Sequence, residues 1–372
     1  MDYETPQFYR VMQYAAGADR DVVDMVSGNP DWDPPEAVRE GLREYADADA
    51  SDFQYAPSRG LRGLRERIAA RHGVETGRIV VTNGAGEANH LAMTAGLDRF
   101  SGREILLSDP VYPYYAGRAN FLGAETRFVP VDENDRLDPD AVRAAASPET
   151  AVVVLNSPNN PTGAVSDADA VAEFAAIAEA NDALLVADEV YDRFDYSGRF
   201  ASALAADSPN VVATNAFSKS MAITGFRVGY AIFPPADGPA GELVERATTR
   251  HMLTNVSGSR PAQHAVERAM ETTDASYYEA ARDRLRARID RFCDALDAAG
   301  ATYTRPDGGF YVLARFEGFP GTFENAYRLI DEAGVAGMPG AAFGEARADD
   351  LRFSLTTPRV DTAAERLVDY FG

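Results

Sequence analysis

The stretch Thr-Asn-Ala-Phe-Ser-Lys-Ser-Met-Ala-Ile-Thr-Gly-Phe-Arg-Val-Gly-Tyr, residues 214–230, contains the only lysine among the 372 residues, Lys219. All other basic side chains are arginine or histidine. Lysine can lose its proton and attack a carbonyl carbon as a free amine, whereas arginine stays protonated. A single lysine in a run of small and hydroxylated residues is therefore a candidate covalent nucleophile. The alternative is a lysine-poor composition that kept one lysine by chance, and the surrounding motifs decide between the two.

A predicted α/β domain surrounds this stretch. Short β-rich runs alternate with helical segments, which is typical of a mostly parallel sheet covered by helices on both faces. The run 151–155, Ala-Val-Val-Val-Leu, has no polar alternation, as expected for a strand buried on both sides. The predicted strands are 79–81, 104–107, 126–129, 151–155, 183–187, 211–214 and 228–233, and the predicted helices between them are 86–99, 113–122, 139–147 and 167–181.

Helix-rich segments precede and follow this region. The predicted elements there are helices at 36–46, 58–72 and 274–300 and strands at 309–313 and 351–355. The last of these helices is charged and amphipathic, and Gly300 ends it. We therefore expect a large three-layer α/β domain over residues 45–255 and a small α+β domain over 1–44 and 256–372.

The charge of the chain excludes several classes of partner. The chain carries 58 acidic and 36 basic side chains, which give a formal net charge of −22, and its pI is about 4.6. Nucleic acid and anionic membrane surfaces both require a basic surface, so neither is expected as a partner. Such an excess of acid destabilises a compact fold at low salt and is screened at molar salt. We therefore expect a halophilic protein from a salt-rich cytoplasm, whose midpoint of unfolding rises steeply from low to molar salt.

The sequence also lacks the usual signals for metal binding and export. Cys293 is the only cysteine, so no intrachain disulfide and no cysteine metal cluster are expected. The four histidines show no ligand spacing. The N-terminus has no basic start followed by an apolar run, and no apolar stretch reaches the length of a membrane span. These features predict a cytoplasmic protein without a metal site.

Three polar motifs follow predicted strands. Residues 83–87, Asn-Gly-Ala-Gly-Glu, open a helix, and the positive end of a helix binds phosphate through its N–H groups. Residues 156–163, Asn-Ser-Pro-Asn-Asn-Pro-Thr-Gly, form a rigid loop, and Asp188 with Tyr191 follows another buried strand. Because ligands of parallel sheets bind at the carboxyl ends of the strands, we expect these motifs to share one site. Each motif alone also fits a local role, such as a glycine turn, an asparagine turn or a capping acid.

Together and in this order, the motifs resemble the class I/II pyridoxal-phosphate aminotransferases of fold type I. The resemblance is carried by Asn-x-Pro-Asn-Asn-Pro-Thr-Gly from Asn156 and by Ser-Lys-x5-Gly-x-Arg-x-Gly-Tyr around Lys219, and it extends from about Gly28 to Arg352. It implies an aminotransferase that moves an α-amino group between an amino acid and a 2-oxo acid by a ping-pong mechanism, with pyridoxal 5′-phosphate as cofactor. A pyridoxal-phosphate carbon–sulfur β-lyase on the same scaffold would share the cofactor residues, so the sequence leaves that alternative open.

The resemblance implies a role for each residue at the cofactor ring. Lys219 corresponds to the Schiff-base lysine, which also shuttles the proton at the substrate's α-carbon. Asp188 corresponds to the acid that keeps the pyridine nitrogen protonated, which makes the ring an electron sink. Tyr191 and Asn156 correspond to the hydrogen-bond donors to the phenolic oxygen of the ring, and Tyr112 corresponds to the aromatic side chain that stacks on it.

The resemblance also implies a phosphate site and a dimer. The residues that match the phosphate site are Gly84, Ala85, Gly86 and Arg227. Many relatives have a serine three residues before the lysine, whereas this chain has Ala216 there, so Ser218 is a candidate to replace that contact. Tyr55 matches a tyrosine that reaches the phosphate of the neighbouring subunit, which implies a homodimer with active sites at the subunit interface.

The resemblance further implies that Arg352 binds the substrate's α-carboxylate through a fork of two hydrogen bonds, with Gly28 and Asn156 beside it. This pattern suits α-amino acids. The choice of amino acid stays open. A second carboxylate, as in aspartate or glutamate, could bind at Arg250 or Arg260, whereas an aromatic pocket could be formed by Trp32, Tyr14 and Tyr311.

Overall fold

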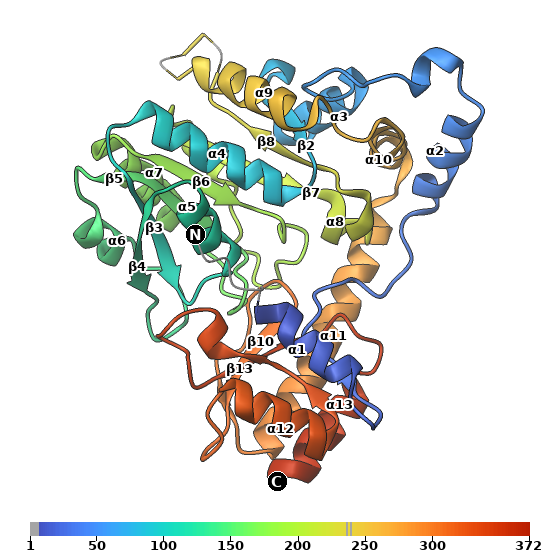
Figure 1. The fold of residues 1–372 in the computed structure, drawn as a ribbon, viewed down its shortest axis with the longest axis vertical. Coiled ribbons are helices and arrows are strands. Elements are labelled where there is room, and N and C mark those ends of the chain that lie inside the picture. The colour runs from blue at the N-terminus through green and yellow to red at the C-terminus, as the bar shows by residue number, and fades with distance from the viewer. Residues whose placement is uncertain (1–6, 236, 239) are drawn as a thin grey trace.

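The computed structural model describes residues 7–235, 237–238 and 240–372, and a seven-stranded sheet forms the core of its larger, upper unit (Figure 1). The strand order is β2-β8-β7-β6-β5-β3-β4. The strands are β2 (Ile79–Thr82), β3 (Glu104–Asp109), β4 (Glu125–Pro130), β5 (Thr150–Asn156), β6 (Leu184–Asp188), β7 (Val211–Ala216) and β8 (Gly229–Ile232). All predicted strands of this region are therefore present.

One strand of the sheet is reversed. β8 pairs antiparallel with both β2 and β7, whereas β3, β4, β5, β6 and β7 pair in parallel. The periodicity of the sequence did not indicate this reversal. The connection from β7 to β8 contains the one-turn helix α8 (Phe217–Ser220) and a short 3₁₀ turn, η4 (Thr224–Phe226), and it lacks the long crossover helix that normally joins parallel neighbours.

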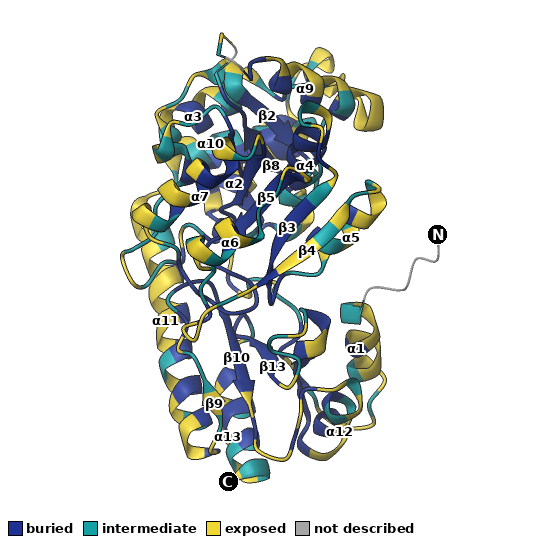
Figure 2. Cartoon of the chain, turned by 90° about the vertical axis from the view of Figure 1, so that its left-hand side faces the viewer, coloured by how far each residue is buried: buried dark blue, intermediate teal, exposed yellow. Residues whose placement is uncertain are grey.

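Helices cover both faces of the sheet. Alternate side chains of a strand point to opposite faces, and in the central strands both sets are apolar, so both faces pack against helices. Val152 and Val154 of β5 belong to the cluster of buried side chains beneath α4, α5 and α9, whereas Val153 and Leu155 belong to the cluster beneath α6 and α7. Figure 2 shows buried strands in the middle of the sheet, whereas the edge strand β4 is largely exposed. These helices are α4 (Ala85–Arg99), α5 (Tyr114–Phe121), α6 (Pro139–Ala145), α7 (Ala168–Ala180) and α9 (Glu242–Asn255). The predicted three-layer arrangement is confirmed.

A third cluster extends the sheet's edge at β2 and β8. It contains Val38, Leu64, Ile79, Tyr230 and Ala265, so three further helices pack on this part of the sheet. These helices are α2 (Glu36–Ala46), α3 (Arg62–His72) and α10 (Arg260–Thr272). The domain boundaries at 45 and 255 stay a prediction, and α2 and α10, which lie outside that range, share this cluster with β2 and β8.

A second, smaller unit contains the C-terminal part of the chain together with the N-terminal segment. Its four-stranded antiparallel sheet has the order β12-β13-β10-β9, and a separate parallel pair joins β1 to β11. The strands are β1 (Val23–Asp24), β9 (Thr302–Tyr303), β10 (Tyr311–Arg315), β11 (Val335–Ala336), β12 (Met338–Pro339) and β13 (Leu351–Ser354). The helices of this unit are α1 (Gln7–Ala16), α11 (Ala275–Ala298), α12 (Phe323–Ala333) and α13 (Val360–Phe371), and it also contains the 3₁₀ turn η5 (Gly340–Ala342). The other 3₁₀ turns lie among the elements of the larger unit: η1 (Ala50–Phe53), η2 (Thr76–Arg78) and η3 (Ala203–Ala206).

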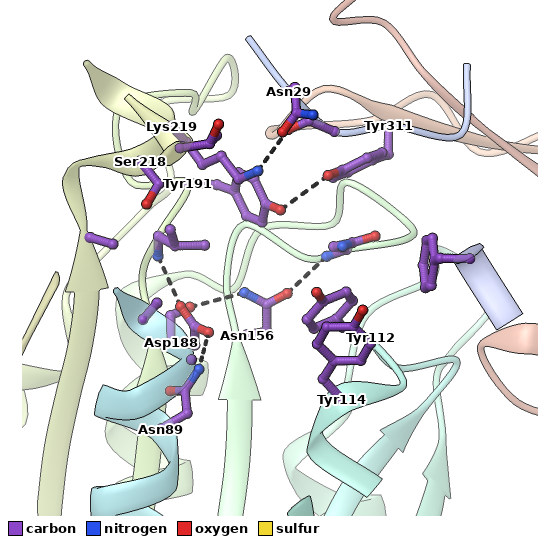
Figure 3. A pocket seen from close by; sticks show the side chains of 18 of the residues that line it. Asn29, Asn89, Tyr112, Tyr114, Asn156, Asp188, Tyr191, Ser218, Lys219 and Tyr311 are labelled. Carbon is purple, nitrogen blue, oxygen red and sulfur yellow. Dashed lines mark hydrogen bonds between the residues drawn. The ribbon is translucent and has the colours of Figure 1, made fainter. Parts of the chain in front are cut away.

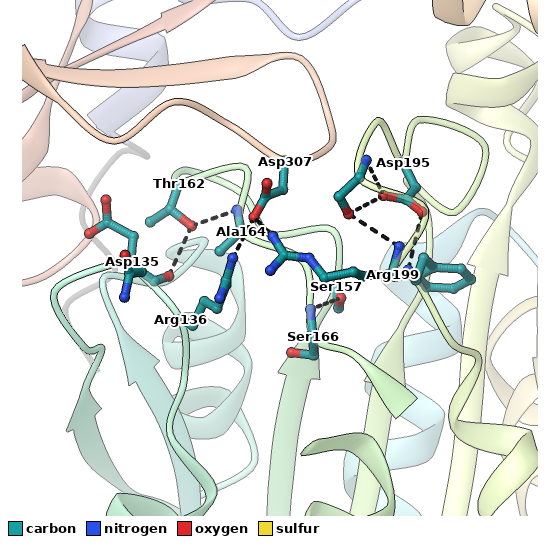
Figure 4. Close-up of polar contacts among 12 residues, drawn as sticks. Asp135, Arg136, Ser157, Thr162, Ala164, Ser166, Asp195, Arg199 and Asp307 are labelled. Atoms are coloured by element: carbon teal, nitrogen blue, oxygen red, sulfur yellow. Dashed lines mark hydrogen bonds and ion pairs between the residues drawn. The ribbon is translucent and has the colours of Figure 1, made fainter. Parts of the chain in front are cut away.

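The loop before β10 attaches the smaller unit to the larger one (Figure 4). Asp307 accepts hydrogen bonds from Arg136 and Arg199 of the α/β unit. The N–H of Gly308 donates to the carbonyl of Gly163, 2.8 Å away, at the end of the Asn156 loop. These contacts place the start of β10 over the carboxyl ends of the parallel strands. No helix within the described residues is long and apolar enough to cross a membrane.

Candidate active site

A cavity of about 410 Å³ lies where the carboxyl ends of β5, β6 and β7 meet β10 and β13 (Figure 3). Most of the predicted site residues line it: Gly28, Ala85, Gly86, Tyr112, Asn156, Asp188, Tyr191, Ser218, Lys219, Arg227 and Arg352. Two predicted residues, Gly84 and Tyr55, do not line it. The structure therefore brings together side chains that are separated by more than 300 positions in the sequence.

Lys219 lies on α8, directly after β7, and its amine lines the cavity. Nζ donates a hydrogen bond to the carbonyl oxygen of Gly28, 2.6 Å away. Burial, together with the positive charges of Arg352 and Arg227, lowers the pKa of Lys219 to about 8. At pH 7 about one tenth of such an amine is neutral, far more than for an ordinary lysine. A Cβ at position 28 would collide with the hydroxyl of Tyr311, so the approach of Gly28 to the amine requires glycine.

Asp188 is the last residue of β6, and its carboxylate is fully buried. The Oδ2 atom accepts hydrogen bonds from the hydroxyl of Tyr115 and from the Nδ2 of Asn89, both at 2.6 Å. The Oδ1 atom accepts one from the N–H of Val190 at 3.1 Å. Burial raises the pKa of Asp188, and the hydrogen bonds from Tyr115 and Asn89 act against that rise. Three donors thus hold the carboxylate in one orientation, and Figure 3 shows the bond from Asn89.

The loop that begins at Asn156 is stabilised by its own polar side chains. Asn156 donates from Nδ2 to the carbonyl of Asp188 at 3.0 Å, and its Oδ1 accepts from the N–H of Asn160 at 2.9 Å. Thr162 donates to the carbonyl of Asp135 and accepts from the N–H of Ala164 (Figure 4). Asn156 therefore stabilises the turn of its own loop, as the local alternative predicted, and it also lines the cavity.

Aromatic side chains form one wall of the cavity. The hydroxyl of Tyr191 lies 3.2 Å from that of Tyr311, and both rings are buried. The ring of Tyr112 lies 4.8 Å from that of Tyr114 and 6.2 Å from that of Phe8, measured between centroids. Burial raises the pKa of Tyr191 and of Tyr112, so both hydroxyls stay protonated at neutral pH and can donate hydrogen bonds.

Arg352, in the middle of β13, is only 1% exposed. Its Nη1 donates to the Oδ1 of Asn160 at 3.3 Å, and its Nη2 donates to the carbonyl of Val26. Its Nε is buried without a hydrogen-bond partner, and no carboxylate in the described part of the chain lies within ion-pair distance. The guanidinium also lies over the ring of Tyr311, 4.4 Å from the centroid. A buried arginine without an acidic partner is a candidate for binding an anion.

The first turn of α4 forms the other charged end of the cavity. No side chain caps this helix, so its first N–H groups are free to bind an anion. Gly84 has a φ of 83°, and a Cβ there would collide with the guanidinium of Arg227. Arg227 itself has a φ of 56°, a strained conformation for a residue other than glycine. Its Nη2 donates to the carbonyl of Asn83 at 3.1 Å, and this bond directs it to the helix end.

The sequence left two possibilities for the substrate's side chain, an arginine that binds a second carboxylate and an aromatic pocket. Arg250 and Arg260 both form ion pairs, with Asp98 and Asp52 respectively, so neither is an unpaired cation in this chain. Of the three aromatic candidates, only Tyr311 lines the cavity. The other two lie elsewhere: Trp32 packs on Phe194, and the hydroxyl of Tyr14 donates to Asp331.

Tyr55 is 78% exposed and lies on the surface, in a shallow depression that also contains Ser257 and Pro261. It makes no contact with the cavity of its own chain. Its predicted contact with the phosphate of a neighbouring subunit stays a prediction.

Several residues at the cavity were not identified from the sequence as functional. Asn89 and Tyr115 hold Asp188, and Phe8 and Arg118 line the cavity. A weak signal was available for two of them. Tyr115 lies three residues after Tyr112, and Asn89 is a polar residue on the mostly apolar buried face of α4. For Phe8 and Arg118 we find no comparable signal.

Comparisons with known proteins give one consistent result. Residues 20–367 match the model of the family described as aminotransferase class I and II. An aspartate/prephenate aminotransferase of Thermus thermophilus is 33% identical over 95% of this chain and 91% of its own. Among solved structures, the aspartate aminotransferase from Thermus thermophilus with maleate has a TM-score of 0.89 at 30% identity, covering 99% of this chain and 100% of that one. N-succinyldiaminopimelate aminotransferase from Mycobacterium tuberculosis has a TM-score of 0.88 at 31% identity, with coverage of 99% and 97%.

These matches extend over nearly the whole chain and include both structural units and the cavity between them. The expected α/β fold, with a mostly parallel sheet and a small second unit, is confirmed as that of the aspartate aminotransferases, and the matched relatives are aminotransferases. The chain belongs to the aminotransferase class I and II family, and it is an aminotransferase.

Proposed function

We propose that Lys219 binds pyridoxal 5′-phosphate and that the cavity transfers the α-amino group of an amino acid to a 2-oxo acid in a ping-pong reaction. One observation carries the proposal. A single cavity contains the chain's only lysine amine, the buried carboxylate of Asp188 and the buried guanidinium of Arg352, which lacks an acidic partner in the described part of the chain. Family membership supports the same cofactor.

The residues of the cavity fit this cofactor in three respects. Its volume of about 410 Å³ lies within the usual range for small-molecule sites. The first turn of α4 is uncapped, and Gly84 leaves room for Arg227 beside it, which suits a phosphate group. The unpartnered Nε of Arg352 suits a carboxylate, which can accept two parallel hydrogen bonds from a guanidinium.

Pyridoxal phosphate, when bound, supplies an aldehyde carbon to the amine of Lys219 and a pyridine ring that withdraws electrons from the substrate's α-carbon. Asp188 would face the nitrogen of that ring and keep it protonated. Its three donors, Tyr115, Asn89 and the N–H of Val190, fix the carboxylate's direction before the cofactor arrives, so no reorganisation is needed at that end.

Lys219 would also move the proton at the α-carbon. A general base must be neutral to accept a proton, and a pKa of about 8 makes the Nζ amine an effective base near neutral pH. Two neighbouring cations, Arg352 and Arg227, contribute to that pKa, so the groups that would bind carboxylate and phosphate also tune the base.

Arg352 would bind the α-carboxylate, with Asn160 fixing one of its Nη atoms. The relatives named above support aspartate as an amino donor. The aromatic wall formed by Phe8, Tyr112 and Tyr311 supports aromatic amino acids as further donors. We therefore propose that aspartate and aromatic amino acids share this site.

A homodimer is proposed as the active form. Large apolar side chains are exposed around α9 and the segment that contains Tyr55, and they are candidates for a subunit interface. They are Phe53, Tyr55, Met252, Leu253 and Val256. Light scattering during gel filtration at molar salt should give twice the 40.1 kDa mass of one chain. A monomer that retains full activity would contradict both the dimer and the role of Tyr55.

The decisive experiment is a half-reaction screen combined with chemical trapping. Borohydride reduction of the protein with bound cofactor should attach one pyridoxyl group to the peptide that contains Lys219. In a parallel unreduced sample, aspartate or an aromatic amino acid added before the borohydride should convert the bound cofactor to its amine form and prevent trapping. No label on Lys219, or conversion by no amino acid, would exclude the proposal.

An acceptor test separates transamination from β-lyase chemistry. With one amino acid and no added 2-oxo acid, a transaminase stops after one turnover per site, because each turnover leaves the amine form. Continuous formation of pyruvate and ammonia under these conditions would indicate the lyase.

A further inference from the structure

The phosphate end of the cavity has few hydroxyl side chains. Ala216 occupies the position where the resemblance predicted a phosphate-binding serine, and Ala85 lies in the first turn of α4. Ser218 and Thr224 are the hydroxylated side chains that line this end. A phosphate monoester carries a charge of about −1.5 to −2 at neutral pH, and Arg227 alone supplies one positive charge. The charge balance therefore calls for a second cation.

A second arginine lies at the same helix end. Arg118 projects from α5 and lines the cavity, and its Nη2 lies 2.9 Å from the place that a Cβ on residue 86 would occupy. Arg227 has the same relation to Gly84. Two guanidinium groups thus flank the first turn of α4, with the N–H groups of Ala85 and Gly86 between them.

Arg118 has an unused capacity for an anion. Its one hydrogen bond is from Nη1 to the carbonyl of Tyr114, at 3.3 Å in the same helix, and no carboxylate of the described residues lies within ion-pair distance. Other arginines of the acidic chain, such as Arg250 with Asp98, are paired with acids. A Cβ at position 86 would displace the end of the Arg118 guanidinium slightly, so glycine lets this group lie directly against the helix end.

We propose that Arg118 is a second cationic ligand of the cofactor's phosphate group and acts with Arg227 across the first turn of α4. This inference rests on the proposed function, because it assumes that a phosphate binds there. The competing role is recognition of a carboxylate on the substrate's side chain. The position of Arg118 beside Gly86 favours the phosphate, because α4's free N–H groups point to the same place.

The test measures binding of inorganic phosphate and of two forms of the cofactor to the apoprotein by calorimetry. Arg118→Met should weaken inorganic phosphate and pyridoxal 5′-phosphate by about 10- to 100-fold, as expected for the loss of a charged hydrogen bond. Binding of pyridoxal, which has no phosphate, should not change. Arg118→Lys should recover part of the loss. Arg246→Met, which removes the same charge from an exposed position of α9 outside the cavity, should bind all three ligands like the original protein.

One further variant and one spectrum provide additional tests of the proposal. Gly86→Ala should weaken phosphate binding in the same direction as Arg118→Met but by less, because it shifts the end of the guanidinium and retains its charge. The phosphorus resonance of the bound cofactor should titrate at a higher pH in Arg118→Met, because a lost cation makes the dianion less favourable. Unchanged phosphate affinity, with a raised KM for aspartate alone, would overturn the proposal and assign Arg118 to the substrate. Failure of Lys219 labelling in the original protein would instead reject the proposed function, while phosphate binding to the apoprotein would still report on Arg118.

Discussion

Asp188 and Arg352 are buried charged groups in one cavity, but their surroundings differ. The carboxylate of Asp188 accepts three hydrogen bonds, all from the α/β unit. The guanidinium of Arg352 comes from the smaller unit and donates to two carbonyl-type oxygens, with its Nε unpartnered. The acid is therefore satisfied before any ligand binds, whereas the arginine keeps an unmet requirement for a negative charge.

This difference indicates how the site divides its tasks. A preformed acid end suits a group that stays bound through many turnovers. An undersatisfied arginine suits a group that enters and leaves in every half-reaction, because the ligand itself supplies the missing charge. Lys219 is coupled to the substrate end of the cavity. Its amine donates to the carbonyl of Gly28, and, in addition to burial, the charge of Arg352 lowers its pKa.

Removal of the Lys219 amine should abolish transamination even though Asp188 and Arg352 both remain. Lys219→Ala should lower transamination by about 10⁴-fold or more, because no other side chain can supply a primary amine as nucleophile and base. Steady-state assays with a coupled acceptor would measure the loss. Lys219→Arg serves as the control, because it retains a positive charge but cannot lose its proton, and it should be equally inactive. Substantial activity in either variant would refute the assignment.

The preformed end should be the next most sensitive. Asp188→Asn should lower kcat by about 10²–10³-fold, since a neutral amide cannot stabilise a protonated ring nitrogen. Tyr115→Phe removes a single donor to Asp188 and should cost about tenfold. Single-turnover kinetics with a saturating amino acid would measure both. If Tyr115→Phe had the larger effect, the hydrogen-bond frame and not the charge would be the essential feature.

The undersatisfied end should respond in a different way. Arg352→Met should lower kcat/KM for amino acids by about 10- to 100-fold, mainly through KM, and leave pyridoxal phosphate affinity unchanged. The apoprotein should lose little stability, because the removal of a buried charge without an acidic partner offsets the loss of the donors to Asn160 and Val26. Asp188→Ala, in contrast, leaves buried donors without an acceptor and should lower the free energy of unfolding. Denaturant titrations of the two apoproteins compare them directly.

A smaller effect is expected on the titration of Lys219. Its folded pKa of about 8 is lower than the ordinary value of 10.5, so the unfolded chain binds more protons between these pH values. The contribution of this group to the free energy of unfolding should therefore rise from pH 8 to pH 10.5, and Lys219→Met should abolish that rise. In Arg352→Met the pKa should increase, because a nearby positive charge is lost.

Reductive methylation with a carbon-13 label would follow this titration. The chain has one lysine, so NMR should show a single dimethyl-lysine resonance in addition to that of the α-amino group. A midpoint near 10.5 in the original apoprotein, or no change in Arg352→Met, would contradict the coupling between the amine and the arginine.

The sequence by itself determined the order of the strands along the chain, the layered α/β architecture and the identity of the central residues. Runs such as 151–155 specify a buried strand, because apolar residues without alternation can be accommodated only between two covered faces. Lys219, Asp188 and Asn156 follow strands directly, so the rule for strand ends was enough to bring them together.

Only the tertiary structure decided which charges have partners. The ion pairs of Arg250 and Arg260, the absence of an acidic neighbour for Arg352 within the described residues, and the approach of Arg118 to Gly86 all join distant segments. The reversed direction of β8 was likewise decided only by the tertiary structure. Periodicity records how deeply each residue is buried, whereas pairing depends on which surfaces meet after folding, and a local pattern does not contain that information.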